Sequence, residues 1–180
     1  KNKGLSDEEA MEKAKEAAEF TGLKPSLWEK SPFELSGGEK RRVAIAGVIA
    51  MDPDVLVLDE PAAGLDPKGR DVLLAQIGSY HQHRKNTVLL VSHSMEDIAR
   101  TADRVLVMNK GKAAMFDTTP NVFARSAELE TMGLRVPQVT AIMTRLQAMG
   151  CPVPCGILTL EQAIKELLAL VKKKEADENA

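Results

Sequence analysis

A pair of glycines stands directly before a segment whose apolar residues recur at helical spacing. The glycines belong to the run Leu35-Ser36-Gly37-Gly38-Glu39. Glycine lets a backbone approach a ligand closely, and the free N–H groups and positive dipole end of a helix start attract anions. The Ser36 hydroxyl adds a further polar group. The run therefore indicates a phosphate-binding turn, although a Ser-Gly-Gly turn standing alone is more often only a helix cap.

Two adjacent carboxylates, Asp59 and Glu60, end the apolar run Val55-Leu56-Val57-Leu58. A continuous apolar run is typical of a strand buried on both faces of a parallel sheet. Ligands bind at the carboxyl edge of such sheets. Asp59 is therefore a candidate for holding magnesium, and Glu60 is a candidate for polarising an attacking water. A solvated acidic pair at the end of a strand is the alternative interpretation.

A lone histidine follows a second apolar run. Thr87–Val91 precedes Ser92 and His93, so we expect His93 at the same sheet edge as the carboxylates. There it could contact a terminal phosphate or the attacking water. His81 and His83 fit an inert surface role.

The elements that must position these residues follow from hydrophobic periodicity and cap residues. Helices are predicted over residues 6–20, 39–51, 67–81 and 95–101, with a loop over 23–34. Two further strands, Arg104–Met108 and Ala113–Phe116, are joined by turn-forming residues. Strands that alternate with helices predict an α/β fold with parallel strands.

The last third of the chain contains only helical patterns. Three helices are predicted, roughly over 120–132, 137–149 and 159–173. Their apolar residues lie at helical spacing, which favours core packing. A surface that contacts a partner is the alternative.

Composition narrows the functional classes. The 180 residues hold 24 Lys and Arg against 26 Asp and Glu, a net charge of −2, and aromatic residues make up 3%. Such a chain is a poor candidate for broad electrostatic binding to nucleic acid or for base stacking. No stretch approaches the roughly 18–20 apolar residues of a membrane helix, so we expect a soluble, intracellular protein. Cys151 and Cys155 form neither a disulfide scaffold nor, without nearby Cys or His, a zinc site.

Taken together, the runs resemble motifs of the ATP-binding-cassette (ABC) ATPases. Leu35–Glu39 is similar to the signature sequence, Val55–Glu60 to the Walker B strand, Ala63–Asp66 to the D-loop, and Ser92-His93 to the switch histidine. The resemblance covers about residues 1–118.

This resemblance implies an α/β fold that is the C-terminal part of a P-loop NTPase core with parallel strands. Residues 1–52 would be part of the helical subdomain with the signature. Residues 53–118 would be the second half of the ATPase core, and residues 119–180 a helical extension.

The resemblance also implies how ATP is bound. Two subunits would face each other head to tail, with two ATP molecules between them. Ser36, Gly37 and Gly38 would contact the γ-phosphate of the ATP held by the opposite subunit. Leu35 and Glu39 complete this ATP-binding run. Glu39 and Arg42 are expected on the helix surface or at the dimer contact rather than in catalysis.

The catalytic roles implied by the resemblance fall on four residues. Asp59 would orient Mg²⁺, and Glu60 would act as general base. His93 would bind the γ-phosphate and help to position the water. Asp66, also counted with the ATP-binding residues, would cross the dimer interface.

A Walker A loop, Gly-x-x-x-x-Gly-Lys-Ser/Thr, is not found in the sequence. Gly111-Lys112 is followed by Ala113, and the run Gly64–Arg70 does not match either. The glutamine loop is not found, and residue 1 is not Met. The family carries both motifs before the signature region, so we expect an N-terminal truncation. We also expect these 180 residues alone to bind ATP weakly and not to hydrolyse it.

The tail favours one branch of the family. Asn121–Phe123, Gly133–Val139 and Ile157–Ala163 resemble the ATPase subunits of energy-coupling-factor importers. Those subunits drive uptake of vitamins and of cobalt or nickel ions. The resemblance implies a second ABC ATPase subunit, a transmembrane coupling protein and a substrate-binding membrane protein as partners, and a peripheral position on the cytoplasmic face of the cell membrane. It implies no nucleic acid partner.

Two alternatives stay open at this point. One is a soluble ABC ATPase that acts on nucleic acid or ribosomes. The other is a non-catalytic partner that donates its signature to a composite ATP site. Retention of Glu60 and His93 favours an enzyme over this passive partner.

Overall fold

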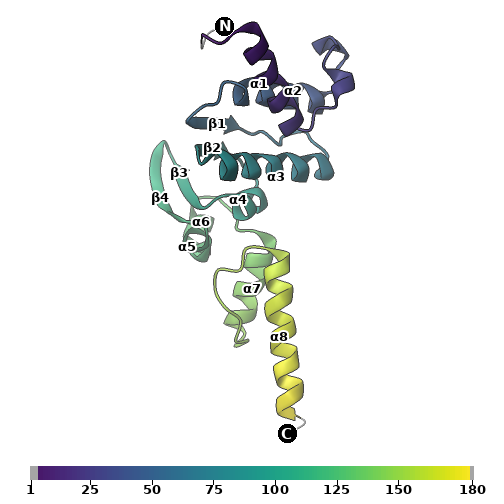
Figure 1. Ribbon diagram of the computed structural model, residues 1–180. Coiled ribbons are helices and arrows are strands. Elements are labelled where there is room, and N and C mark those ends of the chain that lie inside the picture. The colour runs from purple at the N-terminus through teal and green to yellow at the C-terminus, as the bar shows by residue number, and fades with distance from the viewer. Residues whose placement is uncertain (1–3, 179–180) are drawn as a thin grey trace. The chain divides into compact units, whose positions relative to one another are not determined.

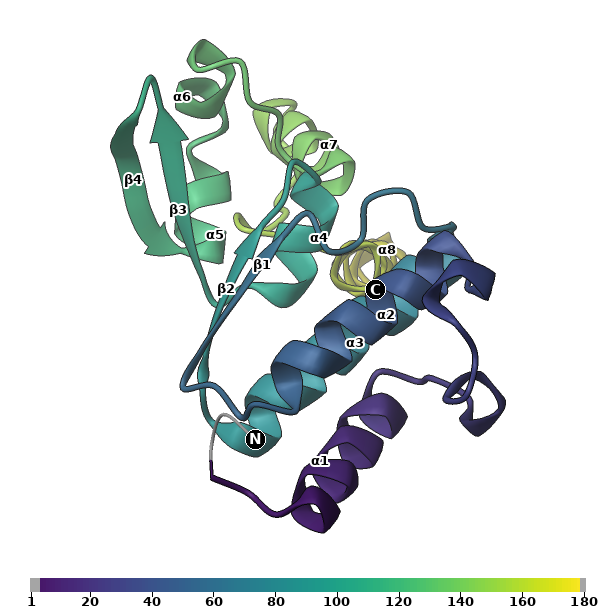
Figure 2. The ribbon, with the colours of Figure 1, turned by 90° about the horizontal axis from the view of Figure 1, so that it is seen from above.

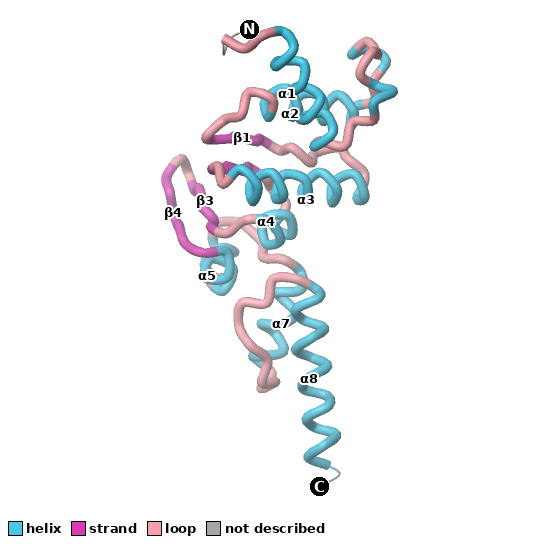
Figure 3. The backbone as a smooth tube through the Cα atoms, viewed as in Figure 1, coloured by secondary structure: helices cyan, strands magenta, loops and turns pink. Residues whose placement is uncertain are grey.

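The computed structural model describes residues 4–178, and the side chains of residues 4–173. This part of the chain divides after Ser92 into two compact units (Figure 1). Both units combine helices and strands, as Figure 3 shows.

Three helices make up most of the first unit: α1 (Asp7–Phe20), α2 (Gly37–Ile49) and α3 (Pro67–Arg84). Two short 3₁₀ turns, Pro25–Leu27 and Pro32–Glu34, fill the segment where the sequence predicts a loop. The predicted capping box at the start of α1 and the proline in the first position of α3 are both confirmed.

The strands of the first unit are β1 (Val55–Asp59) and β2 (Thr87–Val91), which pair in parallel (Figure 2). Asp59 lies opposite Val91 in the register. The predicted parallel strands are therefore confirmed for this pair, whose carboxyl ends lie at one edge.

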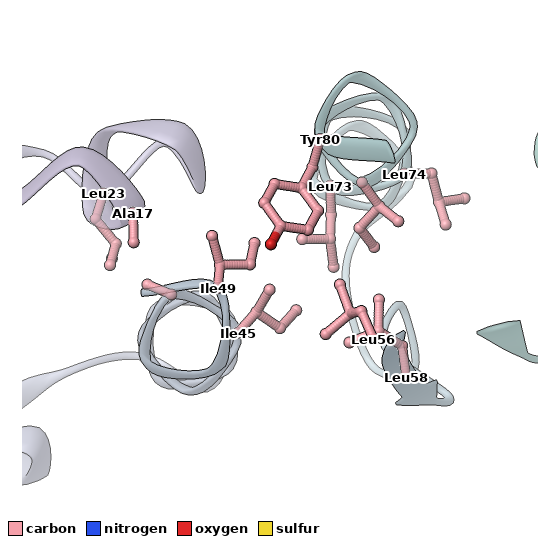
Figure 4. Packing of buried hydrophobic residues seen from close by; sticks show 11 residues of the cluster. Ala17, Leu23, Ile45, Ile49, Leu56, Leu58, Leu73, Leu74 and Tyr80 are labelled. Atoms are coloured by element: carbon pink, nitrogen blue, oxygen red, sulfur yellow. The ribbon is translucent and has the colours of Figure 1, made fainter. Parts of the chain in front are cut away.

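Only one face of this strand pair is covered within the described residues. Leu56 and Leu58 point toward α2 and α3 and are 0% and 7% exposed, whereas Val57 on the opposite face is 59% exposed. On β2, Leu89 and Val91 are exposed too. The prediction of burial on both faces is therefore wrong for this part of the chain, because α2 and α3 pack on the same face (Figure 4).

The core of the first unit lies between these helices and β1. Its members are Ala17, Leu23, Ile45, Ala46, Ile49, Leu56, Leu58, Leu73, Leu74, Ile77 and Tyr80. The Phe20 ring lies edge-on to Tyr80, with ring centroids 5.5 Å apart. Such aromatic pairs stabilise a core beyond the area that they bury.

The second unit begins with α4 (Met95–Thr101), followed by β3 (Arg104–Asn109) and β4 (Lys112–Thr118). β3 and β4 form an antiparallel hairpin and, in the described residues, a sheet of their own. Its turn residues Lys110 and Gly111 both have positive φ, 49° and 76°, as a tight two-residue hairpin turn requires.

Short helices follow the hairpin. The single helix predicted over 120–132 is two helices, α5 (Thr119–Ala124) and α6 (Ser126–Thr131). Arg125 interrupts them because its backbone, at φ −90° and ψ 45°, leaves the helical region.

The tail forms two longer helices, α7 (Gln138–Ala148) and α8 (Leu160–Glu178). Both were predicted, and α8 continues past the predicted end at residue 173. Together with the segment between them they enclose a small apolar cluster of Met143, Val153, Ile157 and Ala163. None of the helices in the described part of the chain is both long and apolar enough to cross a membrane.

Candidate functional site

The predicted phosphate-binding turn forms the start of α2. Ser36 is the N-cap, and its Oγ accepts a hydrogen bond from the Glu39 N–H at 3.3 Å. The Glu39 carboxylate accepts hydrogen bonds from the Ser36 N–H at 2.8 Å and from its hydroxyl at 2.7 Å. These hydroxyl and backbone donors lower the pKa of Glu39 below its usual value. Leu35, directly before this turn, is buried.

The two glycines of this turn have different surroundings. α2 begins two residues earlier than predicted, so Gly37 and Gly38 both lie in its first turn. A Cβ on Gly37 would meet no atom within 4 Å, whereas one on Gly38 would lie 3.2 Å from Leu65 Cδ2. Gly37 therefore faces open space that a ligand could enter. Gly38 allows α2 to pack closely on the loop that follows β1.

The two carboxylates lie where β1 ends. Asp59 is the last residue of the strand, and its side chain is exposed. Glu60 has a φ of 47°, while its N–H still donates to the Val91 carbonyl at 2.9 Å. The Ala63 N–H donates to the Glu60 carbonyl at 3.1 Å and closes a turn. Positive φ at a residue other than glycine is uncommon and clusters at functional sites.

One residue of this region was missed by the sequence analysis. Arg41, on α2, donates from Nη1 to the carbonyl oxygens of Glu60 and Ala63, the latter at 3.1 Å. Its neighbour Arg42 donates to the Thr21 carbonyl at 2.9 Å, away from this turn. The pattern of residue types carries no signal for these contacts, because both acceptors of Arg41 are backbone oxygens.

Asp66 forms the N-cap of α3. Its Oδ1 accepts a hydrogen bond from the Gly69 N–H at 2.7 Å, so the side chain has a local structural role. A role at a dimer interface stays a prediction.

His93 is the first residue of the second unit, two positions after β2, and it is exposed. A contact of His93 with the carboxylates therefore stays a prediction. The structure does bring the signature turn and the residues after β1 together inside the first unit. No cluster of three or more His, Cys, Asp or Glu suited to a metal ion occurs among the described residues.

The fold and the order of the motifs are similar to those of one class of proteins, the ABC ATPase cassettes. The family described as ABC transporter matches residues 1–63. A dimeric structure of a bacterial ABC transporter cassette is similar with a TM-score of 0.58 and 27% identity, covering 64% of this chain and 50% of that one. CbiO1 from Clostridium perfringens, part of the ABC transporter complex CbiONQ, has a TM-score of 0.62 and 33% identity, over 78% and 55%. The predicted fold class is confirmed.

Curated relatives then narrow the class. The energy-coupling factor transporter ATP-binding protein EcfA2 of Caldanaerobacter subterraneus subsp. tengcongensis is 50% identical over 171 residues, 95% of this chain and 60% of that protein. EcfA2 of Clostridium tetani is 52% identical over 175 residues, 97% and 61%. The chain thus spans about 60% of the length of these relatives. The predicted resemblance to energy-coupling-factor ATP-binding proteins is confirmed.

Proposed function

We propose that this chain works as part of the ATPase subunit of an energy-coupling-factor importer, which couples ATP hydrolysis to uptake of a vitamin or a metal ion. One observation carries the proposal. Within one unit, a helix start with open space at Gly37 is held against the turn that bears Asp59 and Glu60. The likeness to proteins named EcfA2 supports the importer branch.

The start of α2 would contact the ATP that is held by the opposite subunit. Its γ-phosphate would approach Gly37, where no side chain stands, and meet the backbone N–H groups of the first turn. The Ser36 hydroxyl, now bonded to Glu39, would turn to a phosphate oxygen. The hydroxyl would then donate to a charged phosphate oxygen instead of the charged Glu39 carboxylate.

The carboxylates of Asp59 and Glu60, at the end of β1, would supply the chemistry. Glu60 would take the proton from the attacking water, and Asp59 would hold Mg²⁺ either directly or through water. Magnesium is commonly bound by one or two carboxylates together with substrate phosphates, and the single exposed carboxylate of Asp59 fits that pattern. When bound, the ion would neutralise part of the charge of the phosphates. His93 would contact the γ-phosphate, and Asp66 would lie at the subunit interface.

The partners follow from the same proposal. A second ABC ATPase subunit would complete the ATP sites. A transmembrane coupling protein and a substrate-binding membrane protein would place the subunit on the cytoplasmic face of the membrane. Residues 1–52 would then serve as the signature-bearing subdomain, 53–118 as the catalytic core and 119–180 as the extension.

Glu60→Gln in the complete gene product tests the proposal. We expect hydrolysis of MgATP to fall by roughly 100-fold or more, because a general base contributes about that factor, while MgATP binding is retained. Glu12→Gln on the exposed surface of α1 is the matched control and should leave hydrolysis unchanged.

Unchanged hydrolysis in Glu60→Gln would contradict the enzyme and favour a passive partner that donates its signature. Reading the coding sequence upstream of Lys1 for a Walker A loop is the first measurement. An in-frame loop supports the site assignments, and a gene that begins here favours the passive partner.

A further inference from the structure

The signature turn and the turn after β1 are joined by two independent contacts. The first is the Arg41 side chain, which donates from one nitrogen to the carbonyl oxygens of Glu60 and Ala63. The second is the close approach of Gly38 to Leu65. Together they connect the first two turns of α2 to the segment that follows the proposed general base.

The backbone of Glu60 needs such support. Its φ of 47° lies in a region that side chains other than glycine rarely adopt. Residues in such conformations persist when the surrounding structure over-determines them. Here the Glu60 N–H is bonded to Val91, and its carbonyl accepts from both Ala63 and Arg41. Arg41 is the one of these partners that belongs to the signature helix.

We propose that Arg41 is a positioning residue, which fixes the backbone of Glu60 against the signature helix so that the general base keeps its productive position. This inference rests on the proposed ATPase function. Both acceptors of Arg41 are backbone carbonyl oxygens of the Glu60–Ala63 turn, so its effect on the reaction would pass through that turn. A displaced base about 1 Å from its productive position can lower a rate by about 100-fold.

The neighbouring arginine provides a matched control. Arg42 lies one position along the same helix and is also half-buried, but it bonds to the Thr21 carbonyl and approaches Gln76 Oε1 at 3.5 Å. Removing Arg42 would loosen α2 from α1 and α3. Removing Arg41 would instead release the turn that carries Glu60.

The kinetic experiment compares Arg41→Ala, Arg41→Lys and Arg42→Ala in the complete gene product. We expect Arg41→Ala to lower kcat for MgATP about 10- to 100-fold with KM changed less than about threefold. Arg41→Lys should recover much of kcat, because both hydrogen bonds come from one nitrogen and an ammonium has three donors. Arg42→Ala should lower the thermal midpoint but keep kcat within about twofold.

Equal losses of kcat in Arg41→Ala and Arg42→Ala, or a kcat within about twofold of wild type in Arg41→Ala, would overturn the proposal. Hydrogen exchange of the amides of residues 60–66 gives a readout that does not depend on turnover. We expect faster exchange there in Arg41→Ala and Arg41→Lys to be close to wild type, with no change in Arg42→Ala.

This design separates the two hypotheses. If wild type and Glu60→Gln hydrolyse ATP equally, the proposed function fails, and the exchange data still decide whether Arg41 holds the turn. If Glu60→Gln is inactive while Arg41→Ala is fully active, only the positioning role fails. Should Arg41→Ala not fold, Arg41→Gln takes its place in the comparison, and Arg41→Lys stays the conservative control.

Discussion

Both α1 and α2 begin with a capping box. In α1, the Ser6 N–H donates to Glu9 at 2.8 Å, and the Glu9 N–H donates to Ser6 Oγ at 3.2 Å. In α2 the equivalent distances between Ser36 and Glu39 are 2.8 and 3.3 Å. The two helix starts therefore satisfy their backbone donors in the same way.

The two capping boxes differ in the residues that lie between their serine and their glutamate. Asp7 and Glu8 fill the first turn of α1, whereas Gly37 and Gly38 fill that of α2. Acidic side chains already complement the positive end of the α1 dipole, so a further anion would be repelled. The comparison teaches that the capping box sets where a helix begins, and that the two residues between its members decide whether an anion can approach.

Making α2 resemble α1 should have the largest effect. We expect Gly37→Asp to reduce MgATP hydrolysis by the complete gene product about 100-fold, because a second negative charge near a phosphate costs about 1–4 kcal/mol at 4 Å. The free energy of unfolding should stay the same or rise by roughly 0.3–1 kcal/mol, since an acid at a helix start is stabilising.

The reverse change, Glu8→Gly in α1, is the control. It should cost about 1 kcal/mol of stability through lower helix propensity and leave hydrolysis unchanged. Full activity in Gly37→Asp would show that the open space at Gly37 does not receive phosphate.

Removing the cap serine should separate stability from activity. Ser6→Ala and Ser36→Ala should each cost about 1 kcal/mol, measured by chemical denaturation, because both lose the same N-cap. Only Ser36→Ala should also lower hydrolysis, by roughly 10-fold, through loss of a hydrogen bond to a charged phosphate. Equal activity in the two variants would show that the hydroxyl of Ser36 does not contact the phosphate.

Neutralising the glutamate of each box should have a smaller effect. Glutamine also completes a capping box, so neither Glu9→Gln nor Glu39→Gln should unfold its helix. We expect Glu39→Gln to tighten MgATP binding about two- to fivefold, because a charge at an exposed helix start is worth about 0.3–1 kcal/mol. Titration with MgATP measures this change. A weaker affinity would indicate that the Glu39 carboxylate helps to hold the nucleotide.

The loss of stability at low pH should be similar for the two capping boxes. Hydrogen bonds from the paired serine lower the pKa of Glu9, as they do that of Glu39. A carboxyl with a lowered folded pKa stabilises the fold above its unfolded pKa of about 4.3, and this contribution is lost as pH falls through the folded value. Thermal midpoints between pH 6 and 3 should therefore fall less steeply in Glu9→Gln and in Glu39→Gln. Identical slopes in wild type and both variants would contradict the assignment.

Much of the local structure could be predicted from short-range signals. Ser6 with Glu9 specified the start of α1, and Pro67 specified that of α3. The apolar runs identified β1 and β2, but not how many of their faces are covered. Burial of each face depends on which helices pack on the sheet. The same apolar run occurs in strands with one covered face and in strands with two, so the sequence does not distinguish them.

The candidate site divides in the same way. The sequence by itself determined the motif order, the presence of a helix at the signature and the carboxylates at the end of β1. Only the tertiary structure decided that Gly38 is a packing position while Gly37 is open, and that Arg41 rather than Arg42 holds the turn of Glu60. Arg41 lies 19 and 22 residues from its two acceptors. These are backbone carbonyls that every residue type offers, so the partner of each arginine is set by how α2 packs against the end of β1.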